Sequence, residues 1–446
     1  MRPSQTRAGA LARWGRLALW ALPGLLAIPL VGWLGLGAAD GWASDKPSQK
    51  KSATRPVKAP AVQPVYLGPM VVLGFNDLGM HCMNDRFNEI CILPPYNNLH
   101  AQVIARGEEP RIVTSGVTVS YNVPGNTRSS TKTDFWQYAH ALFGATLKPD
   151  VGLTGNGLSG NMNTTGNGDW AATGIPITPI QDDGSTNAYA LSNISVTARN
   201  TLQARTVAVV PVSWEIRCDL CHNTPGVTVA SDILIRHDRL HGTDLQHHKP
   251  VLCASCHADP ALGTLGVPGV KSMSSAMHGS HASRMALLSG NPNAPANACY
   301  ACHPGKVTDC QRDVHKAKGI TCGDCHSPGW NTPPRRQDWQ FAMATVGNPN
   351  RTAWVDEPTC GSCHSKRNPS FDYEEPGKLF KVSRGHHGVL CASCHGSPHA
   401  VVPAVTAPDN QQSIALQGKA APLGKCSVCH RTTPDDRFTH SLRGDD

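Results

Sequence analysis

Aromatic side chains are scarce in this chain of 446 residues, because Phe, Tyr and Trp together make up only 6% of it. Charged residues are also few, at 16%, and no cluster of Lys and Arg interleaved with aromatics occurs in the body of the chain, so we expect no nucleic-acid partner. No Ser/His/Asp arrangement, phosphate-binding loop or paired-carboxylate constellation stands out. The sequence therefore carries no signature of a hydrolase, a nucleotide-dependent enzyme or a nucleic-acid-binding protein.

Cysteine and histidine are abundant instead, with 17 Cys and 21 His. Fourteen of the Cys form seven copies of Cys-x-x-Cys-His, where composition alone predicts roughly 0.03 copies. In chain order, motifs 1 to 7 are Cys218, Cys221 and His222; Cys253, Cys256 and His257; Cys299, Cys302 and His303; Cys322, Cys325 and His326; Cys360, Cys363 and His364; Cys391, Cys394 and His395; and Cys426, Cys429 and His430.

The motif is the attachment signature of haem c. Two thiols at this spacing add to the two vinyl groups of one porphyrin, and the adjacent His ligates the iron as the proximal ligand. Zinc ribbons do not place a His directly after each second Cys, and thioredoxin-like motifs occur singly in a βαβ context. We therefore expect seven covalently bound haem c groups.

A second axial ligand for each iron has to come from outside the motifs, and the C-terminal half holds a surplus of His. A His close to one motif reaches the iron of a neighbouring motif more easily than the far face of its own haem, which would place successive haems in contact. Met residues such as Met273 are alternative ligands. The candidate distal ligands are His237, His241, His248, His278, His281, His315, His386, His387, His399 and His440.

The N-terminal 64 residues resemble an export signal followed by a tether. Residues 1–44 hold a basic start, an apolar run and a small-residue cleavage site, which predicts a signal peptide, with an uncleaved membrane anchor as the alternative. Residues 45–64 are rich in Lys, Pro and Ser and predict a flexible linker. We expect a periplasmic or extracellular location, at the cell surface in the latter case.

Residues 65–216 contain no motif and predict a β-rich domain, either a sandwich or a barrel. Alternating or β-branched runs predict strands within 65–75, 100–123 and 194–214, a short helix over 133–142 and a loop over 152–168. Residues 217–446 supply only about 30 residues per motif, too few for an ordinary core. We expect a seven-haem cytochrome c domain of short helices and irregular chain packed around porphyrins.

Three Cys lie outside the motifs. Cys82 and Cys91 predict a disulfide that closes an eight-residue loop, since an oxidising compartment favours pairing. A metal site that uses these Cys with His81 or His100 is the alternative. Cys310 has no obvious partner, and a free thiol, a haem ligand and an intermolecular bond all stay open.

Several stretches resemble the secreted multihaem c-type cytochromes of respiratory bacteria, including those that pass electrons to extracellular acceptors. They are Gly74-Phe-Asn-Asp-Leu-Gly-Met-His-Cys82, Leu93-Pro-Pro-Tyr-Asn-Asn-Leu-His-Ala-Gln102, Lys249-Pro-Val-Leu-Cys-Ala-Ser-Cys-His257 and Cys394-His-Gly-Ser-Pro-His-Ala400. The resemblance implies low-potential haems with two His ligands that act as an electron wire.

We expect an electron carrier between redox partner proteins of the cell envelope and a metal or soluble terminal acceptor, with a homo-oligomer or filament as an open assembly state. The alternative is a multihaem reductase of a small nitrogen or sulfur oxyanion, with one iron open to substrate. All seven motifs end in His, and no unusual motif marks such an iron.

Overall fold

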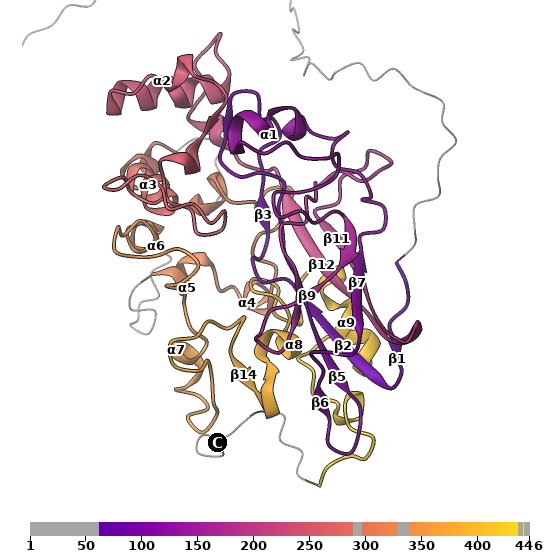
Figure 1. Cartoon of the computed structure of the whole chain (residues 1–446). Helices are drawn as coiled ribbons and strands as arrows, with labels where there is room; N and C mark the ends of the chain where they lie inside the picture. Colours follow the sequence, from indigo (N-terminus) through magenta and orange to yellow (C-terminus); the bar gives the residue numbers. More distant parts are fainter. Residues whose placement is uncertain (1–61, 289–296, 328–338, 436–439, 441–446) are drawn as a thin grey trace, which may run out of the picture. The chain divides into compact units, whose positions relative to one another are not determined.

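A computed structural model describes residues 62–288, 297–327, 339–435 and 440 (Figure 1). These residues belong to one compact unit within Lys58–Asp446, which includes both the predicted β-rich segment and the predicted haem segment. The signal predicted over 1–44 and most of the linker predicted over 45–64 lie outside the described residues. Within the described ranges, no helix is long and apolar enough to cross a membrane.

The N-terminal half is rich in antiparallel β-structure, as its alternating sequence predicts. The first sheet has the order β1 (Tyr66–Leu67), β12 (Thr201–Ser213), β11 (Tyr189–Ala198), β7 (Thr118–Asn122) and β8 (Ser159–Asn161), with β3 (His81–Cys82) parallel to the end of β12. The second has the order β2 (Met70–Phe75), β5 (Leu99–Ala105), β10 (Trp170–Ala172) and β9 (Asn163–Thr164), with β6 (Arg111–Ile112) beside β5.

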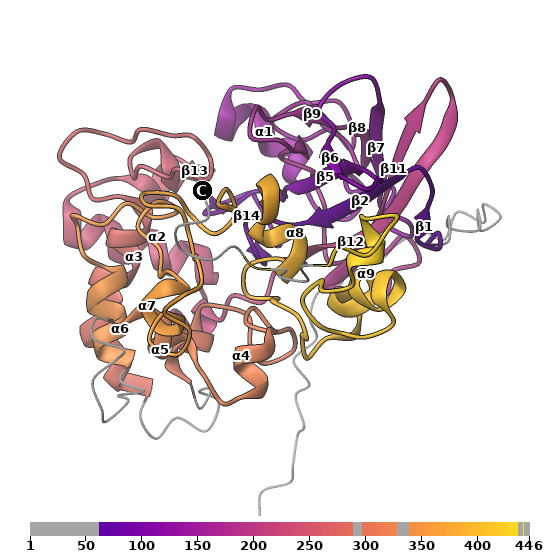
Figure 2. The same cartoon turned by 90° about the horizontal axis from the view of Figure 1, so that it is seen from below.

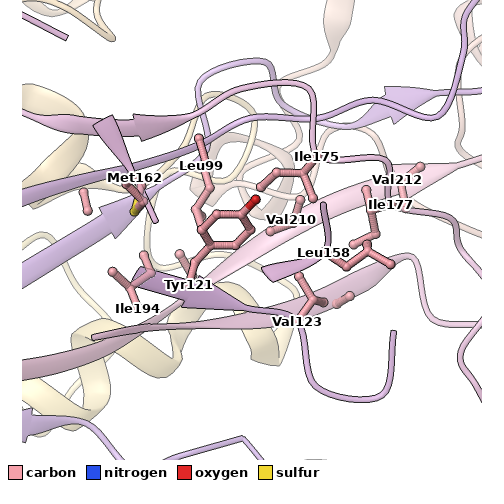
Figure 3. Packing of buried hydrophobic residues seen from close by; sticks show 14 of the residues in the cluster. Leu99, Tyr121, Val123, Leu158, Met162, Ile175, Ile177, Ile194, Val210 and Val212 are labelled. Carbon is pink, nitrogen blue, oxygen red and sulfur yellow. The ribbon is translucent and has the colours of Figure 1, made fainter. Parts of the chain in front are cut away.

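The main hydrophobic core lies among side chains from both of these sheets. Leu99 of β5, Tyr121 of β7 and Ile194 of β11 are almost completely buried in one cluster, which Figure 3 shows from close by. Removing most of such a side chain, as in Leu99→Ala, costs about 2–5 kcal/mol in a typical core. This region therefore has an apolar core of its own, built without any contribution from the Cys-x-x-Cys-His motifs.

The predicted strands and the predicted helix occur close to their expected positions. The helix expected over 133–142 is α1 (Phe135–Phe143), and Gly144 ends it in a left-handed conformation. The expectation of a loop over 152–168 was wrong in part, because β8 and β9 both lie inside it. Hydrogen bonds from β7 and β10 hold these two short, exposed strands in place, and a pattern of burial along the sequence cannot reveal such pairing.

Later in the chain the regular elements are short and mostly helical, in agreement with the shortage of core-forming residues. The α-helices are α2 (Val229–His241), α3 (Met273–His281), α4 (Val314–Ala317), α5 (Cys322–His326), α6 (Trp339–Val346), α7 (Gly361–His364), α8 (Cys391–His395) and α9 (Ala407–Gln417). The 3-10 helices are η1 (Cys218–Leu220), η2 (Leu245–His247), η3 (Cys253–Ser255), η4 (Ala282–Leu288), η5 (Ala298–Ala301), η6 (His386–Gly388) and η7 (Cys426–Val428). Two small ladders complete the list: β13 (Val251–Leu252) with β4 (Ile90–Cys91), and β14 (Arg384–Gly385) with β15 (Val389–Leu390).

The C-terminal elements are tied to the sheets by two polar side chains, the buried Gln102 and the half-buried Gln412. Gln412 of α9 accepts hydrogen bonds from the backbone N–H of Gly74 in β2 and the hydroxyl of Thr206 in β12, each at 2.7 Å. Gln102 of β5 accepts from the N–H of Leu390 at 2.9 Å and the hydroxyl of Ser393 at 3.0 Å. Figure 2 shows α8 and α9 against the strands. Motif 6, which forms α8, is therefore fixed directly on the second sheet.

Candidate cofactor sites

Each Cys-x-x-Cys-His motif folds into a single helical turn. Motifs 1, 2, 3 and 7 begin 3-10 helices, whereas motifs 4, 5 and 6 lie in the short helices α5, α7 and α8. In motif 1, for example, the N–H of His222 donates to the carbonyl of Cys218 at 2.8 Å. Residues i, i+3 and i+4 lie on one face of such a turn, so both thiols and the imidazole are presented together. This is the arrangement that covalent attachment and ligation of one porphyrin require.

Each motif histidine lies beside one histidine from outside the motifs, with ring centres 6.0–6.4 Å apart. Within the described residues, no motif histidine has a second histidine ring at this distance. In motif order, the pairs are His222 with His281, His257 with His237, His303 with His278, His326 with His399, His364 with His315, His395 with His440, and His430 with His386.

These separations fit one iron between the two rings of each pair. A metal–imidazole bond is about 2 Å long, so two imidazoles on opposite sides of an iron hold their nitrogens about 4 Å apart. Each nitrogen lies roughly 1 Å from the centre of its ring, which places the two centres about 6 Å apart. Ordinary aromatic contacts also fall between about 4.5 and 7 Å. The one-to-one match between partners and motifs, rather than the distance alone, is what distinguishes the seven pairs.

The structure separates the ten distal candidates into two groups. Seven lie beside a motif histidine, and three do not: His241, His248 and His387. The ring of His241 lies 4.8 Å from that of His237, and the ring of His387 lies 5.3 Å from that of His386. His248 is exposed, and its Nδ1 lies 2.7 Å from the carbonyl oxygen of Asp244. Sequence position could not separate the groups, because a surplus histidine and a partner histidine often lie on the same turn.

Hydrogen bonds at Nδ1 orient many of the paired rings. On α3, Nδ1 of His278 and of His281 lies 2.8 and 2.6 Å from the carbonyl oxygens of Ser274 and Met277, one turn earlier. Nδ1 of the motif histidine His257 lies 2.8 Å from the carbonyl oxygen of Lys271. A protein acceptor at Nδ1 fixes the tautomer and leaves Nε2 free for a metal. The backbone acceptors carry no sequence signal, so only the fold reveals them.

Burial keeps several of the paired imidazoles neutral, which is the form that binds a metal. Burial lowers the pKa of His303 to about 4 and that of His326 to about 3, and neighbouring imidazoles contribute to both shifts. His315 differs, since its hydrogen bond with Asp313 raises its pKa despite partial burial. A carboxylate behind an imidazole strengthens it as a ligand. The sequence signal was present here, because Asp313 precedes His315 by two residues.

Thiols of successive motifs lie near one another. A hydrogen bond between motifs 3 and 4 raises the pKa of Cys299 and lowers that of Cys322 to about 7. Elsewhere burial raises a thiol pKa first and a thiol of another motif raises it further: Cys302 beside Cys221, Cys325 beside Cys363, Cys360 beside Cys391, and Cys394 beside Cys429. These electrostatic interactions link neighbouring motifs in the order 1, 3, 4, 5, 6, 7.

Helix α2 connects motif 2 to motif 1, the first motif in this order. Asp232 of α2 lies 3.2 Å from Nδ1 of the motif 1 histidine, His222. His237, further along the same helix, lies beside the motif 2 histidine, His257. Thr228 caps the start of α2 by accepting from the N–H of Ser231, which fixes the helix that carries both contacts. The spatial order of the motifs is therefore 2, 1, 3, 4, 5, 6, 7.

A large cavity of about 1360 Å³ lies beside motifs 5 and 7, since Gly361 and His430 are among its lining residues. Its lining includes His386 and His430 of the seventh pair, together with His440 of the sixth. Pockets for drug-sized ligands usually measure about 300–1,000 Å³, so this space accommodates a group as large as a porphyrin. The histidine pairs, the thiol positions and the cavity together fit haem c at the motifs.

The histidines of the β-rich region occupy a different environment. His100 lies between two carboxylates, with Nδ1 2.7 Å from Asp169 and Nε2 3.5 Å from Asp77. Burial alone would lower the pKa of His100, but its hydrogen bonds to these carboxylates raise it to about 9. Burial lowers the pKa of His81 to about 4, and its Nε2 lies 2.8 Å from the carbonyl oxygen of Pro94.

No set of three His, Cys, Asp or Glu side chains in the described ranges gathers as a metal site. The structure therefore gives no support to the alternative of a Cys/His metal site in the β-rich region. The histidine pairs are not affected by this result, because a haem iron needs only two protein ligands.

The structure does not contain the predicted disulfide between Cys82 and Cys91, and the thiols of Cys82, Cys91 and Cys310 are all free in it. Cys82 lies in β3 opposite Ser213 of β12, whereas Cys91 lies in β4 opposite Leu252 of β13. The two Cys therefore belong to different ladders, and neither ladder pairs one with the other. The prediction rested on proximity in the sequence and on the expected oxidising compartment, and neither reports strand pairing.

Comparisons of the chain with protein-family models, with curated proteins and with solved structures found no match.

Proposed function

We propose that this chain is an electron-transfer protein that carries seven haem c groups, one at each Cys-x-x-Cys-His motif, with two His ligands to each iron. The observation that carries the proposal is the one-to-one pairing of motif and partner histidines at 6.0–6.4 Å. Seven one-to-one pairs of this kind would be unfavourable in a protein without metal, because apolar side chains would fill the same space better.

The residues of the chain have separable tasks in this proposal. The thiols would hold each porphyrin covalently, and the motif His and the partner His would both ligate its iron. Bound haem supplies a one-electron couple of iron. Two protein ligands leave no position for a substrate at the iron, which favours an electron carrier over the alternative of an oxyanion reductase.

The order of the motifs supports a single series of haems that runs 2, 1, 3, 4, 5, 6, 7. Helix α3 carries two partner histidines, His278 for motif 3 and His281 for motif 1, so one rigid element spans two neighbouring haems. Interlocked ligands of this kind keep the haems close and fix their separation. We propose that electrons enter and leave at the two ends of the series, near motifs 2 and 7.

The remaining proposals concern fold, location and partners. The two sheets would form a sandwich, and the porphyrins would supply the core among the short helices. Covalent haem attachment and the predicted signal over residues 1–44 favour a periplasmic or extracellular location. The partners would be redox proteins of the cell envelope and a metal or soluble terminal acceptor. Assembly into an oligomer or filament is not needed to complete the ligand sets.

A haem count and a spin-state measurement on the purified protein test the proposal. We expect a pyridine haemochrome assay and intact mass to give seven haems per chain, and electron paramagnetic resonance of the oxidised protein to show only low-spin iron. Far fewer than seven haems would refute covalent attachment at the motifs. A high-spin iron that binds nitrite, sulfite or cyanide would favour the reductase.

A further inference from the structure

The three cysteines outside the motifs lie in two different places. Cys91 is completely buried in the main hydrophobic core, opposite Leu252 of β13. Cys82 and Cys310 are both partly buried, and they lie where the first sheet meets the chain that follows motif 3. Two thiols from distant parts of the sequence at one junction raise the question of whether they pair.

The strand register directs Cys82 toward the segment that contains Cys310. Cys82 lies opposite Ser213 in the parallel ladder of β3 and β12, and residues paired in a ladder point to the same face of the sheet. The hydroxyl of Ser213 lies 2.9 Å from the hydroxyl of Thr308. Thr308 precedes Cys310 by two residues, so the thiol of Cys82 shares its face of the sheet with this segment.

Backbone hydrogen bonds hold the segment around Cys310 in place. The carboxylate of Glu215 accepts from the N–H groups of Lys306, Val307 and Thr308 at 2.7–3.1 Å. The N–H of Asp309 donates to the Tyr189 hydroxyl at 2.6 Å. A segment fixed in this way presents its side chains in one arrangement, which lowers the entropy lost when a cross-link forms.

A backbone hydrogen bond fixes Cys310, and the charge of its thiol acts on Cys82. Its N–H donates to the carbonyl of Pro304 at 3.0 Å. Burial raises the pKa of Cys82, and the charge of Cys310 raises it further, whereas Cys91 is not among the groups that shift it. Burial also raises the pKa of Cys310, to about 11. Of the two other non-motif thiols, Cys310 alone is among the groups whose charge acts on Cys82.

We propose that Cys82 and Cys310 form a disulfide that joins β3 to the loop after motif 3. In the reaction the two S–H bonds break and one S–S bond forms, with release of two protons. The two electrons pass to a disulfide-bearing oxidant, a protein or small-molecule disulfide of the oxidising compartment, which takes up the two protons as well and is reduced to two thiols. The bond would anchor the first sheet to the chain between motifs 3 and 4, and it requires no haem.

Disulfide mapping of the full chain tests this inference. The purified protein is denatured and alkylated without reduction, digested, and analysed by mass spectrometry. We expect a linked pair of peptides that contains Cys82 and Cys310, which reduction separates, and an alkylated Cys91. A Cys82–Cys91 link, or three thiols that are all alkylated before reduction, would overturn the proposal.

Matched variants supply the controls. Cys91→Ser should leave the Cys82–Cys310 link intact, and Cys310→Ser should leave Cys82 open to alkylation. If Cys310→Ser does not accumulate, the map of the unaltered protein and of Cys91→Ser still decides the question. The haem count on the same samples is a separate readout, so failure of the disulfide is distinguishable from failure of the proposed function.

Discussion

Removing one partner histidine should open one iron and leave the other six unchanged. His278 is the most direct choice, because its ring centre lies 6.0 Å from that of His303 and its Nδ1 bonds to the carbonyl of Ser274. It lies in α3, where Ala is the best helix former, so His278→Ala should keep the helix. The thioether bonds of motif 3 do not involve His278, so we expect the haem count to stay at seven.

The size of the effect follows from the pairing. One iron in seven, about 14% of the total, should become five-coordinate and high-spin. After reduction the variant should bind about one carbon monoxide per chain, whereas the unaltered protein should bind none if every iron has two protein ligands as proposed. Carbon monoxide titration followed in the Soret band measures this stoichiometry, and electron paramagnetic resonance of the oxidised protein measures the high-spin fraction.

His241→Ala is the matched control, because His241 also lies on a helix but is exposed and does not lie beside a motif histidine. It should show seven low-spin irons and no carbon monoxide binding. The reasoning fails if His278→Ala stays entirely low-spin, or if both variants give the same high-spin signal. His278→Met extends the test, because a thioether ligand should keep the iron six-coordinate and raise the potential of one haem in seven.

Three further predictions concern the stability of the haem-loaded protein in urea. Arg312→Met should lower the free energy of unfolding by about 3–5 kcal/mol, because the fully buried guanidinium binds Asp409 at 2.7 and 3.1 Å and the carboxylate would be left unpaired. Adding Asp409→Leu should restore part of this loss. A double variant with no recovery would contradict the pairing. His100→Gln should lower the free energy of unfolding by roughly 3 kcal/mol below pH 6.5, because the pKa of His100 in the folded protein, about 9, exceeds its unfolded value. The difference in stability from the unaltered protein should vanish as the pH rises through about 9. A difference that stays constant with pH would refute this prediction. Gln102→Leu should lower the free energy of unfolding by about 1–3 kcal/mol, because its buried hydrogen-bond partners in β15 and α8 would be left unpaired. Gln203→Leu removes only an exposed hydrogen bond to the carbonyl of Thr201 within β12, so it should change the stability little.

Local patterns predicted much of the fold because they report local physical preferences. The strand expected over residues 70–75 is β2, and the helix expected over 133–142 is α1 within two residues. The short strands β8 and β9 were missed, since their stability comes from partners in β7 and β10 rather than from their own exposed side chains. The docking of α9 through Gln412 was also beyond prediction, because a polar residue on a helix gives no indication of a distant strand.

The candidate sites show the same division between local and distant information. Spacing within a motif is local, so the sequence identifies every thiol and motif histidine of the seven candidate sites. The choice among the ten distal candidates depends on contacts between segments as far apart as His326 and His399, or His395 and His440. Neighbouring candidates such as His237 and His241 lie on one helix, and only the fold shows that His237, not His241, lies beside a motif histidine.

By itself, the sequence determined the number and composition of the motifs, the β-rich character of the N-terminal half and the small number of residues per motif in the C-terminal half. Only the tertiary structure decided which histidine faces which motif, in what order the motifs follow one another, and that Cys82 shares a sheet face with the segment of Cys310 rather than a ladder with Cys91. The physical reason is that a turn of helix is stabilised within five residues, whereas a ligand pair or a disulfide needs two distant segments held in register by the packing of everything between them.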